Sequence, residues 1–285
     1  MSLLRGKAVV ITGAGRGLGA AHARGCARRG AFVVVNDIDA AAAEETVAAI
    51  RADGGSALAC VADISDWDEA GRLIDSCLEA FGRIDGLVNN AAQFHWALIT
   101  DYDPQAAERL VRTNVMGALN CAGRAVKPMV AQGSGSIINT TSGAQMGLQK
   151  LSIYGATKGA VASMVYTWAL ELAGSGVRAN AISPIADTHD GPDRRQAVLT
   201  PRPYRAPEAN TPLVEYLLSD LSAEITGQVI RMDGEKLAMC SHPAIMTPPA
   251  VRESWTAEAI AQVFEGEFKA LLAPCGRVKA TAPAG

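Results

Sequence analysis

The chain has 285 residues, of which 49% are hydrophobic and 19% charged, and its formal net charge is −3. This balance excludes disordered, collagen-like and charged coiled-coil chains, and the negative charge offers no basic footprint for nucleic acid. A chain of this length can bury a large core without disulfides. Its six cysteines are scattered with no Cys-x-x-Cys pair, which indicates free thiols in a reducing compartment.

No segment has the length and composition of a membrane span or a signal peptide. The apolar stretch 87–99 is interrupted by Asn and His and falls short of the ~18 residues that a spanning helix needs. The apolar run 8–11 behind the first basic residues is too short for a signal-peptide core. We therefore expect a cytoplasmic protein that binds neither membrane nor nucleic acid.

In chain order, short apolar runs alternate with segments of helical periodicity. The expected strands are 8–11, 32–35, 57–61, 86–88, 136–138, 178–182 and 228–230. The expected helices are 18–30, a segment ending at 53, 65–81 with Ser65 as N-cap, 104–132 and 154–174. This alternation predicts an α/β fold, a doubly wound parallel sheet of about seven strands with helices on both faces.

The partition into domains follows from what the chain lacks. Neither an internal repeat nor a flexible linker interrupts it, so one domain over residues 1–285 is expected. The segment 187–211 contains four prolines and several charges and is expected to form a loop over the strand ends. Residues from about 235 to 285 are expected to form a C-terminal extension.

A glycine-rich turn follows the first strand and indicates a nucleotide site. Glycines there allow a tight turn and a close approach to a pyrophosphate, which the amides of the next helix then hold. The turn residues expected to bind a cofactor are Gly13, Arg16, Gly17, Leu18 and Gly19.

Asp37 ends the second strand about 20 residues after Gly17, where a carboxylate accepts hydrogen bonds from a ribose 2′-hydroxyl and repels a 2′-phosphate. Asp37 argues for NAD over NADP. Arg16 opposes this, because a guanidinium beside the turn can pair with a 2′-phosphate. A solvated surface charge is the other reading of Arg16.

The next strand ends supply further candidate cofactor residues. Asp63 and Ile64 follow the third strand and would receive the adenine, although Asp63 equally suits the start of the next helix. Asn90 and Ala91 follow the fourth strand, where alanine permits a close approach to a ribose and Asn can brace neighbouring loops.

Tyr154 and Lys158 are four residues apart, so both lie on one face of a helix. Together with the glycine turn, Asp37 and Ser142 at another strand end, this pair makes the chain resemble the short-chain dehydrogenase/reductase family, in its single-domain branch with the Thr-Gly-x-x-x-Gly-x-Gly pattern. The resemblance covers about residues 6–234 and implies a Rossmann-like fold.

The resemblance implies a role for each matching residue. Tyr154 corresponds to the catalytic acid/base, Lys158 to its activator and a ribose ligand, Ser142 to the substrate-oxygen anchor, and Asn114 to the residue that holds a relay water. Pro184 and Thr188 resemble the segment that contacts the nicotinamide. The pattern departs from the family where Ala92 and Ile185 replace glycine.

The implied function is an NAD-dependent oxidoreductase that interconverts a secondary alcohol and a ketone. Phe94, Trp96, Leu148 and Gln149 are expected to border the substrate, and the aromatics favour an apolar cyclic, steroid-like, terpenoid or acyl molecule. No metal is expected, since the four histidines lack ligand spacing. The resemblance also suggests a homotetramer, or a homodimer.

Two alternatives stay open. An NADPH-dependent ketoreductase would differ only in whether the attraction of Arg16 for a 2′-phosphate outweighs the repulsion by Asp37. A non-catalytic dinucleotide-binding regulator would share the glycine turn, but it would not need Asn114, Ser142, Tyr154 and Lys158 together.

Overall fold

A computed structural model describes residues 2–186, 205–245 and 247–272. The chain divides into two compact units, Met1–Cys240 and Ser241–Gly285. The second unit contains the helix α9 (Ala257–Glu265), which begins where the Thr256 hydroxyl accepts the backbone N–H of Ala259. The expectation that the whole chain forms one domain stays a prediction.

The first unit is built on one sheet of eight strands in the order β3-β2-β1-β4-β5-β6-β7-β8. The strands are β1 (Ala8–Ile11), β2 (Phe32–Asp37), β3 (Ser56–Val61), β4 (Gly86–Asn89), β5 (Gly135–Thr140), β6 (Val177–Pro184), β7 (Val229–Met232) and β8 (Leu237–Met239). The first seven run parallel, which confirms the predicted fold class. Strand order reverses at β1, whose neighbours are β2 and β4, and such a point opens a crevice at the carboxyl ends of the strands.

The eighth strand is an addition to the seven that the sequence predicts. β8 pairs antiparallel with β7 after a tight turn in which the Asp233 carboxylate accepts the N–H groups of Glu235 and Lys236. All three residues of β8 are exposed, so the strand has neither the alternation nor the buried run by which the others are recognised.

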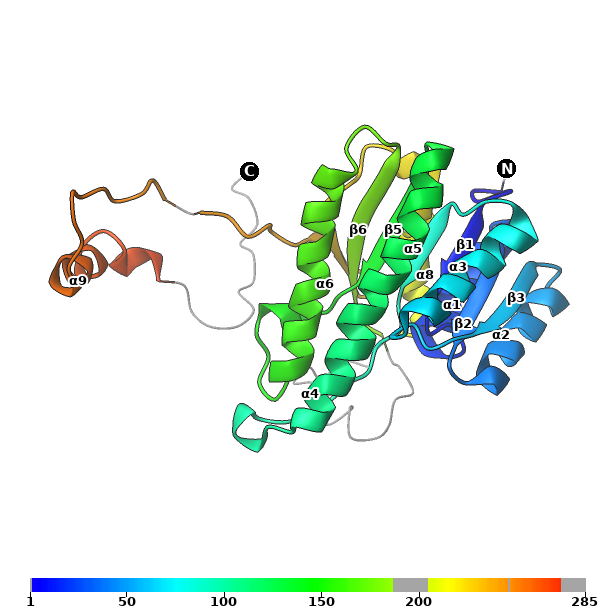
Figure 1. Ribbon diagram of the computed structural model, residues 1–285, viewed down its shortest axis with the longest axis horizontal. Helices are drawn as coiled ribbons and strands as arrows, with labels where there is room; N and C mark the ends of the chain where they lie inside the picture. The colour runs from blue at the N-terminus through cyan, green and yellow to red at the C-terminus, as the bar shows by residue number, and fades with distance from the viewer. Residues whose placement is uncertain (1, 187–204, 246, 273–285) are drawn as a thin grey trace. The chain divides into compact units, whose positions relative to one another are not determined.

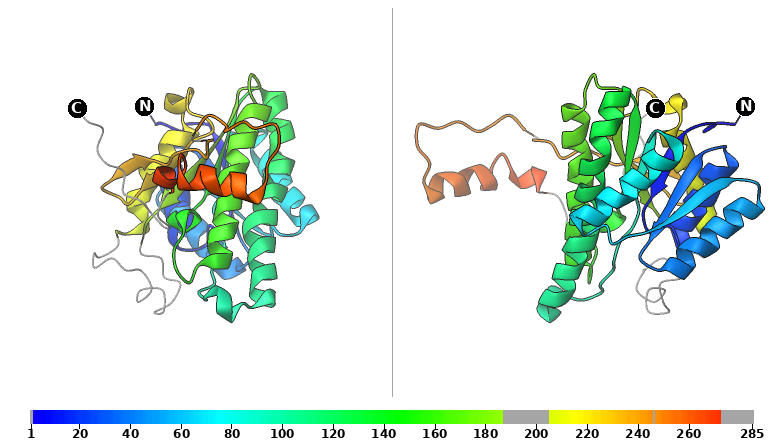
Figure 2. Two further views of the ribbon diagram at one scale, coloured as in Figure 1. Left: turned by 90° about the vertical axis from the view of Figure 1, so that its left-hand side faces the viewer. Right: turned by 45° about the vertical axis from the view of Figure 1, so that its right-hand side comes forward.

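Helices cover both faces of the sheet, as predicted. The helices α1 (Gly17–Arg28), α2 (Ala40–Ala52) and α8 (Thr211–Leu218) pack on one face, and α3 (Trp67–Phe81), α5 (Gly117–Gln132) and α6 (Ser152–Glu171) pack on the other. Figure 1 shows α6, α5 and α3 side by side over the sheet, and the right-hand view of Figure 2 shows the same layer obliquely. The strands between these layers are buried on both sides, which explains their continuous apolar sequence.

The bounds of α1 and α6 differ from the expected 18–30 and 154–174 by one to three residues, and two further differences have a physical reason. The N-cap of α3 is Asp66, whose carboxylate accepts the N–H groups of Asp68 and Glu69; the prediction of Ser65 is wrong by one residue. The expected helix 104–132 is interrupted, because α4 (Pro104–Val111) is followed by a π-helical turn, Arg112–Met116, before α5 begins. In this turn the Gly117 N–H donates to the Arg112 carbonyl, which lies five residues earlier.

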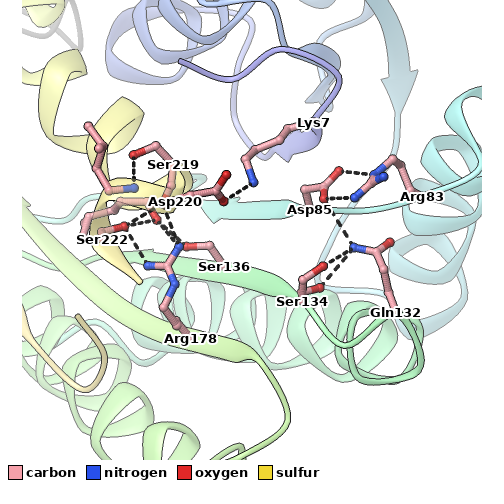
Figure 3. A network of polar contacts seen from close by, with 12 residues as sticks. Lys7, Arg83, Asp85, Gln132, Ser134, Ser136, Arg178, Ser219, Asp220 and Ser222 are labelled. Atoms are coloured by element: carbon pink, nitrogen blue, oxygen red, sulfur yellow. Dashed lines mark hydrogen bonds and ion pairs between the residues drawn. The ribbon is translucent and has the colours of Figure 1, made fainter. Parts of the chain in front are cut away.

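The amino ends of the strands carry a network of polar contacts (Figure 3). Asp85, which precedes β4, accepts the backbone N–H of Ala8 at 2.9 Å and two hydrogen bonds from the Arg83 guanidinium. Arg178 at the start of β6 donates to the Ser222 hydroxyl and to the Leu217 carbonyl at the end of α8. This end of the sheet is thus closed by side chains that satisfy one another.

Candidate active site

A cavity of about 520 Å³ opens at the carboxyl ends of the strands. Most of the site residues predicted from the sequence line it, namely Gly13, Arg16, Gly17, Leu18, Asp37, Asp63, Ile64, Asn90, Ala91, Ser142, Tyr154, Lys158 and Pro184. It lies where the sheet topology places a ligand crevice, beside the reversal of strand order between β1 and β4.

The glycine turn between β1 and α1 has the conformation that only glycine adopts easily. Gly13 and Gly17 have φ values of +59° and +56°. Gly19 is needed for packing instead, because a Cβ atom there would lie 2.1 Å from the Gly13 carbonyl oxygen. Gly13 and Gly17 therefore border the cavity, while Gly19 lies behind them and holds α1 close to the turn.

Thr12 and Asn90 lock this turn to the end of β4. The Thr12 hydroxyl accepts the N–H groups of Asn90 and Ala91 at 3.0 and 3.1 Å, and the Asn90 amide donates to the carbonyls of Thr12 and Gly13. Asn90 thus braces the neighbouring loop and lines the cavity at the same time. Thr12 was not among the predicted site residues, although its position directly before the glycine turn could have indicated this role.

Asp37 is fixed at the end of β2 by two backbone donors. Its carboxylate accepts the N–H of Gly15 at 3.0 Å and the N–H of Asp39 at 3.1 Å. Arg16 forms an ion pair of 2.5 Å with Asp39. The Ala42 N–H and, less strongly, the Arg16 guanidinium hold the pKa of the Asp39 carboxyl below its usual value. The Arg16 guanidinium beside the glycine turn is therefore paired with the Asp39 carboxylate, which lies at the same end of the cavity as Asp37.

Asp63 lies both in the cavity wall and in the turn before α3, and its contact with an adenine stays a prediction. The Asp63 carboxylate accepts the Ser65 N–H at 2.9 Å in this turn. A cavity residue that the sequence analysis missed lies beside it: buried Asn36 donates to the carbonyls of Cys60 and Ala62. An amide directly after the apolar run of β2 was the available signal.

Ser142, Tyr154 and Lys158 meet at the opposite end of the cavity. Lys158 is 3% exposed, and its Nζ donates to the Thr140 carbonyl at 2.7 Å and lies 5.6 Å from the centre of the Tyr154 ring. The Ser142 hydroxyl accepts the Ala144 N–H at 3.2 Å. The helical spacing of Tyr154 and Lys158 thus brings a phenol and a buried ammonium together, with a hydroxyl in the wall of the same cavity.

Asn114 is buried behind the cavity wall, on the π-helical turn. Its carboxamide accepts the Gln93 N–H at 2.7 Å and donates to the Gln93 carbonyl and to the Thr157 hydroxyl, both at 3.0 Å. Asn114 therefore joins the loop after β4 to α6, three residues from Tyr154.

The residues predicted to border a substrate divide into two groups. The Phe94 ring lies 4.7 Å from the Tyr154 ring, and Trp96 stacks on Phe94 at 6.2 Å. Leu148 and Gln149 are exposed. None of these four residues belongs to the lining of the cavity. Thr188 lies outside the described residues.

The cavity fits an elongated ligand that carries phosphates and hydroxyls. The first turn of α1 borders it, and the N–H groups of a first helical turn have no intrahelical partner. Asp37 offers acceptors at one end, and the buried Thr140 hydroxyl in the wall has no hydrogen-bond partner in the part of the chain that the structure describes. A bound dinucleotide would supply such a partner, so the residues suit that class of cofactor.

The described residues contain no group of three or more His, Cys, Asp or Glu that could hold a metal ion. None of the helices in this part of the chain has the length and apolar character to cross a membrane.

Comparisons with known proteins agree with the geometry. The family model described as short chain dehydrogenase matches residues 7–189. The chain is 32% identical to a 3-oxoacyl-(acyl-carrier-protein) reductase of Thermotoga maritima, over 81% of this chain and 98% of that protein. It is 34% identical to a cis-4-hydroxycyclohexanecarboxylate dehydrogenase of Sinomonas cyclohexanicum, over 80% and 95%.

The fold has a counterpart among solved structures. The crystal structure of a short chain dehydrogenase from Mycobacterium avium superposes with a TM-score of 0.85 at 30% identity, covering 98% of this chain and 100% of that one. The matched family model, these relatives and the shared fold show that the chain belongs to the short-chain dehydrogenase/reductase family, oxidoreductases that work with a nicotinamide dinucleotide.

Proposed function

We propose that the protein is an NAD-dependent oxidoreductase that interconverts a secondary alcohol and a ketone, with Tyr154 as the general acid/base. The observation that carries this proposal is the buried Lys158 ammonium beside the Tyr154 ring, in the wall of the cavity. A bound nicotinamide would supply the hydride acceptor or donor for the substrate carbon.

Lys158 stabilises the ionised form of the tyrosine. At 5–6 Å and an effective dielectric constant of about 20, one ammonium stabilises a phenolate by about 3 kcal/mol. Its Nζ is oriented by the hydrogen bond to the Thr140 carbonyl, so this stabilisation requires no reorganisation. In alcohol oxidation the Tyr154 oxygen takes the hydroxyl proton of the substrate, and in ketone reduction it returns that proton to the substrate oxygen.

Ser142 is suited to hold the substrate oxygen. Its hydroxyl oxygen already accepts the Ala144 N–H, and its own hydrogen donates to none of the described residues. That hydrogen is available to the oxygen on which negative charge develops. Asn114 positions the two sides of the site by holding Gln93 and Thr157 together.

The choice of NAD rests on Asp37. Its fixed carboxylate lines the cavity and would lie against the charge of a 2′-phosphate, while it can accept hydrogen bonds from a ribose hydroxyl. The NADPH-dependent alternative depends on Arg16, which lines the same end but is paired with Asp39.

The substrate class follows from the side chains beside Tyr154. Phe94 and Trp96 form an apolar aromatic wall, which suits a cyclic, steroid-like, terpenoid or acyl body. The name of the Sinomonas relative, a dehydrogenase of a cyclic hydroxy acid, supports a ring-shaped secondary alcohol. A non-catalytic regulator is disfavoured, because it has no use for a buried ammonium against a cavity phenol.

The decisive experiment replaces Tyr154 by Phe. Turnover of a panel of secondary alcohols with NAD⁺, followed at the NADH absorbance band, should fall by about 10²–10⁴-fold, the usual contribution of a general acid/base. NAD⁺ binding, measured by calorimetry, should persist. Tyr102→Phe removes a hydroxyl from an exposed ring and is the control. Unchanged turnover in Tyr154→Phe would refute the assignment.

We also propose that the protein assembles as a homotetramer or homodimer. This rests on the family resemblance alone, and analytical ultracentrifugation of the full chain tests it. A monomer at micromolar concentration would contradict it.

A further inference from the structure

We propose that Asp39 is a second determinant of cofactor choice: it captures the Arg16 guanidinium and so disables a binding site for a 2′-phosphate that the chain otherwise has. The inference rests on the proposed NAD dependence. Asp39 itself does not line the cavity, whereas Arg16 and Asp37 do. Asp39 would therefore act through Arg16, as a positioning residue.

The two carboxylates of this edge have different partners. Asp37 accepts the N–H groups of Gly15 and Asp39, and it lies in the cavity wall. One oxygen of Asp39 accepts the Ala42 N–H at the start of α2, and the other accepts Arg16 Nη2 at 2.5 Å. One oxygen of Asp39 thus caps the helix α2, and the other binds the Arg16 guanidinium.

Arg16 stands where a phosphate would be bound. It is the N-cap residue of α1, directly before Gly17, and it lines the cavity with a side chain that is 72% exposed. Among the described residues, its only ion pair is the one with Asp39. A guanidinium recognises phosphate with two parallel N–H groups, so a carboxylate on Nη2 competes directly with that geometry.

One substitution should suffice, because Asp39 is the carboxylate that pairs with the Arg16 guanidinium. Asp39→Asn removes that partner and frees the guanidinium for a phosphate, while Asp37 still accepts from a ribose hydroxyl. The variant should then bind NADP⁺ more tightly than the wild type does.

The ion pair contributes little to the fold. Arg16 is largely exposed and Asp39 partly exposed, and ion pairs in contact with solvent add little to the stability of a protein. Asparagine also replaces aspartate well as a helix N-cap, so Asp39→Asn keeps the bond to Ala42. The variant should therefore fold normally, which allows its effect on binding to be measured.

The test measures the affinities of NAD⁺ and NADP⁺ by calorimetry for the wild type, Asp39→Asn, Arg16→Ala and the double variant. Asp39→Asn should bind NADP⁺ at least tenfold more tightly than the wild type, in the range that coupled charge pairs produce at interfaces, with NAD⁺ affinity nearly unchanged. In the Arg16→Ala background the same substitution should have almost no effect. Asp68→Asn is the matched control, because it removes an exposed carboxylate that pairs with Arg124 at 2.9 Å instead.

Each outcome discriminates. An unchanged NADP⁺ affinity in Asp39→Asn would overturn the inference. A gain in NADP⁺ affinity that also appears in the Arg16→Ala background, or in Asp68→Asn, would overturn it as well, because such a gain would be a general effect of charge. The proposed function is judged on the wild type alone: it fails if the unmodified protein binds no NAD⁺ or prefers NADP⁺. Failure of the inference leaves the wild-type preference for NAD⁺ intact.

Discussion

The two ends of the central sheet satisfy their polar groups in different ways. At the amino ends, the Asp85 carboxylate has Arg83, the Ala8 N–H and Gln132 as partners, and Figure 3 shows the dense network around them. At the carboxyl ends, side-chain oxygens of Asn89 and Thr140 are buried with no hydrogen-bond partner among the described residues, and the Lys158 ammonium is buried beside the cavity.

This difference separates stability from function along single strands. Complete hydrogen bonding at the amino ends fixes where the strands begin and how α8 ends against them. The carboxyl ends leave the Thr140 hydroxyl without a partner among the described residues, at a cost in free energy that a ligand in the cavity would recover. Substitutions at the two ends should therefore change different measured quantities.

The largest effect is expected from Lys158→Met. Loss of the ammonium beside Tyr154 should lower turnover by about 10²–10⁴-fold, because the phenolate loses its stabilising charge. The free energy of unfolding should not fall, since a methionine side chain suits a buried site without the desolvation cost of an ammonium. Steady-state kinetics and urea denaturation test both statements, with exposed Lys127→Met as the control. Retained turnover, or a large loss of stability, would contradict the comparison.

Asp85→Ala should show the opposite behaviour. The carboxylate is 5% exposed, and its removal leaves the Ala8 N–H and the Arg83 guanidinium without their acceptor. We expect a loss of about 3 kcal/mol in the free energy of unfolding, with unchanged turnover at 25 °C. The exposed carboxylate of Asp68, removed in Asp68→Ala, is the control. A catalytic defect in folded Asp85→Ala would show that the two ends are coupled.

His22 extends the comparison to pH. This histidine is buried in α1, its Nε2 has no partner among the residues that the structure describes, and burial lowers its pKa to about 4. Since the unfolded chain takes up the proton near pH 6.5, the stability is complete above that pH and falls as the pH drops toward 4, by about 3 kcal/mol in total. Denaturation curves of the wild type and His22→Asn over this range should differ in slope by about one proton. Parallel curves would contradict the assignment.

The smallest effects come from two residues of β5. Ser136→Ala removes a buried hydroxyl that donates to the Leu217 carbonyl at 2.8 Å, and it should cost about 1 kcal/mol of stability. Thr140→Val removes a buried hydroxyl that has no partner and should raise the stability of the unliganded protein by up to about 1 kcal/mol, while it weakens cofactor binding. Thermal unfolding and NAD⁺ titration measure both, and shifts of the same sign would contradict the comparison.

The sequence predicts the fold well, because the signals that define it are local. Apolar runs such as 8–11 mark strands buried on both faces, and the spacing of Tyr154 and Lys158 places them together on α6. β8 could not be predicted, since its side chains are exposed and it depends on pairing with β7.

The missed features of the site depend on contacts between distant residues. Arg16 and Asp39 meet only because β1 and β2 are neighbours, and Asn114 reaches Gln93 from another element. Neither contact leaves a periodic pattern. Leu148 and Gln149, in contrast, precede Tyr154 closely in the chain but lie outside the cavity wall.

The wide turn at Arg112–Met116 has a consequence for how the enzyme can diversify. A π-turn holds one residue more than the regular helix, and removing it would rotate everything before it by about 100° around the helix axis. Asn114 would then lose its two hydrogen bonds to the Gln93 backbone. Because Asn114 contacts only main-chain atoms of Gln93, the Gln93 side chain can be exchanged during evolution without breaking the link between this loop and α6.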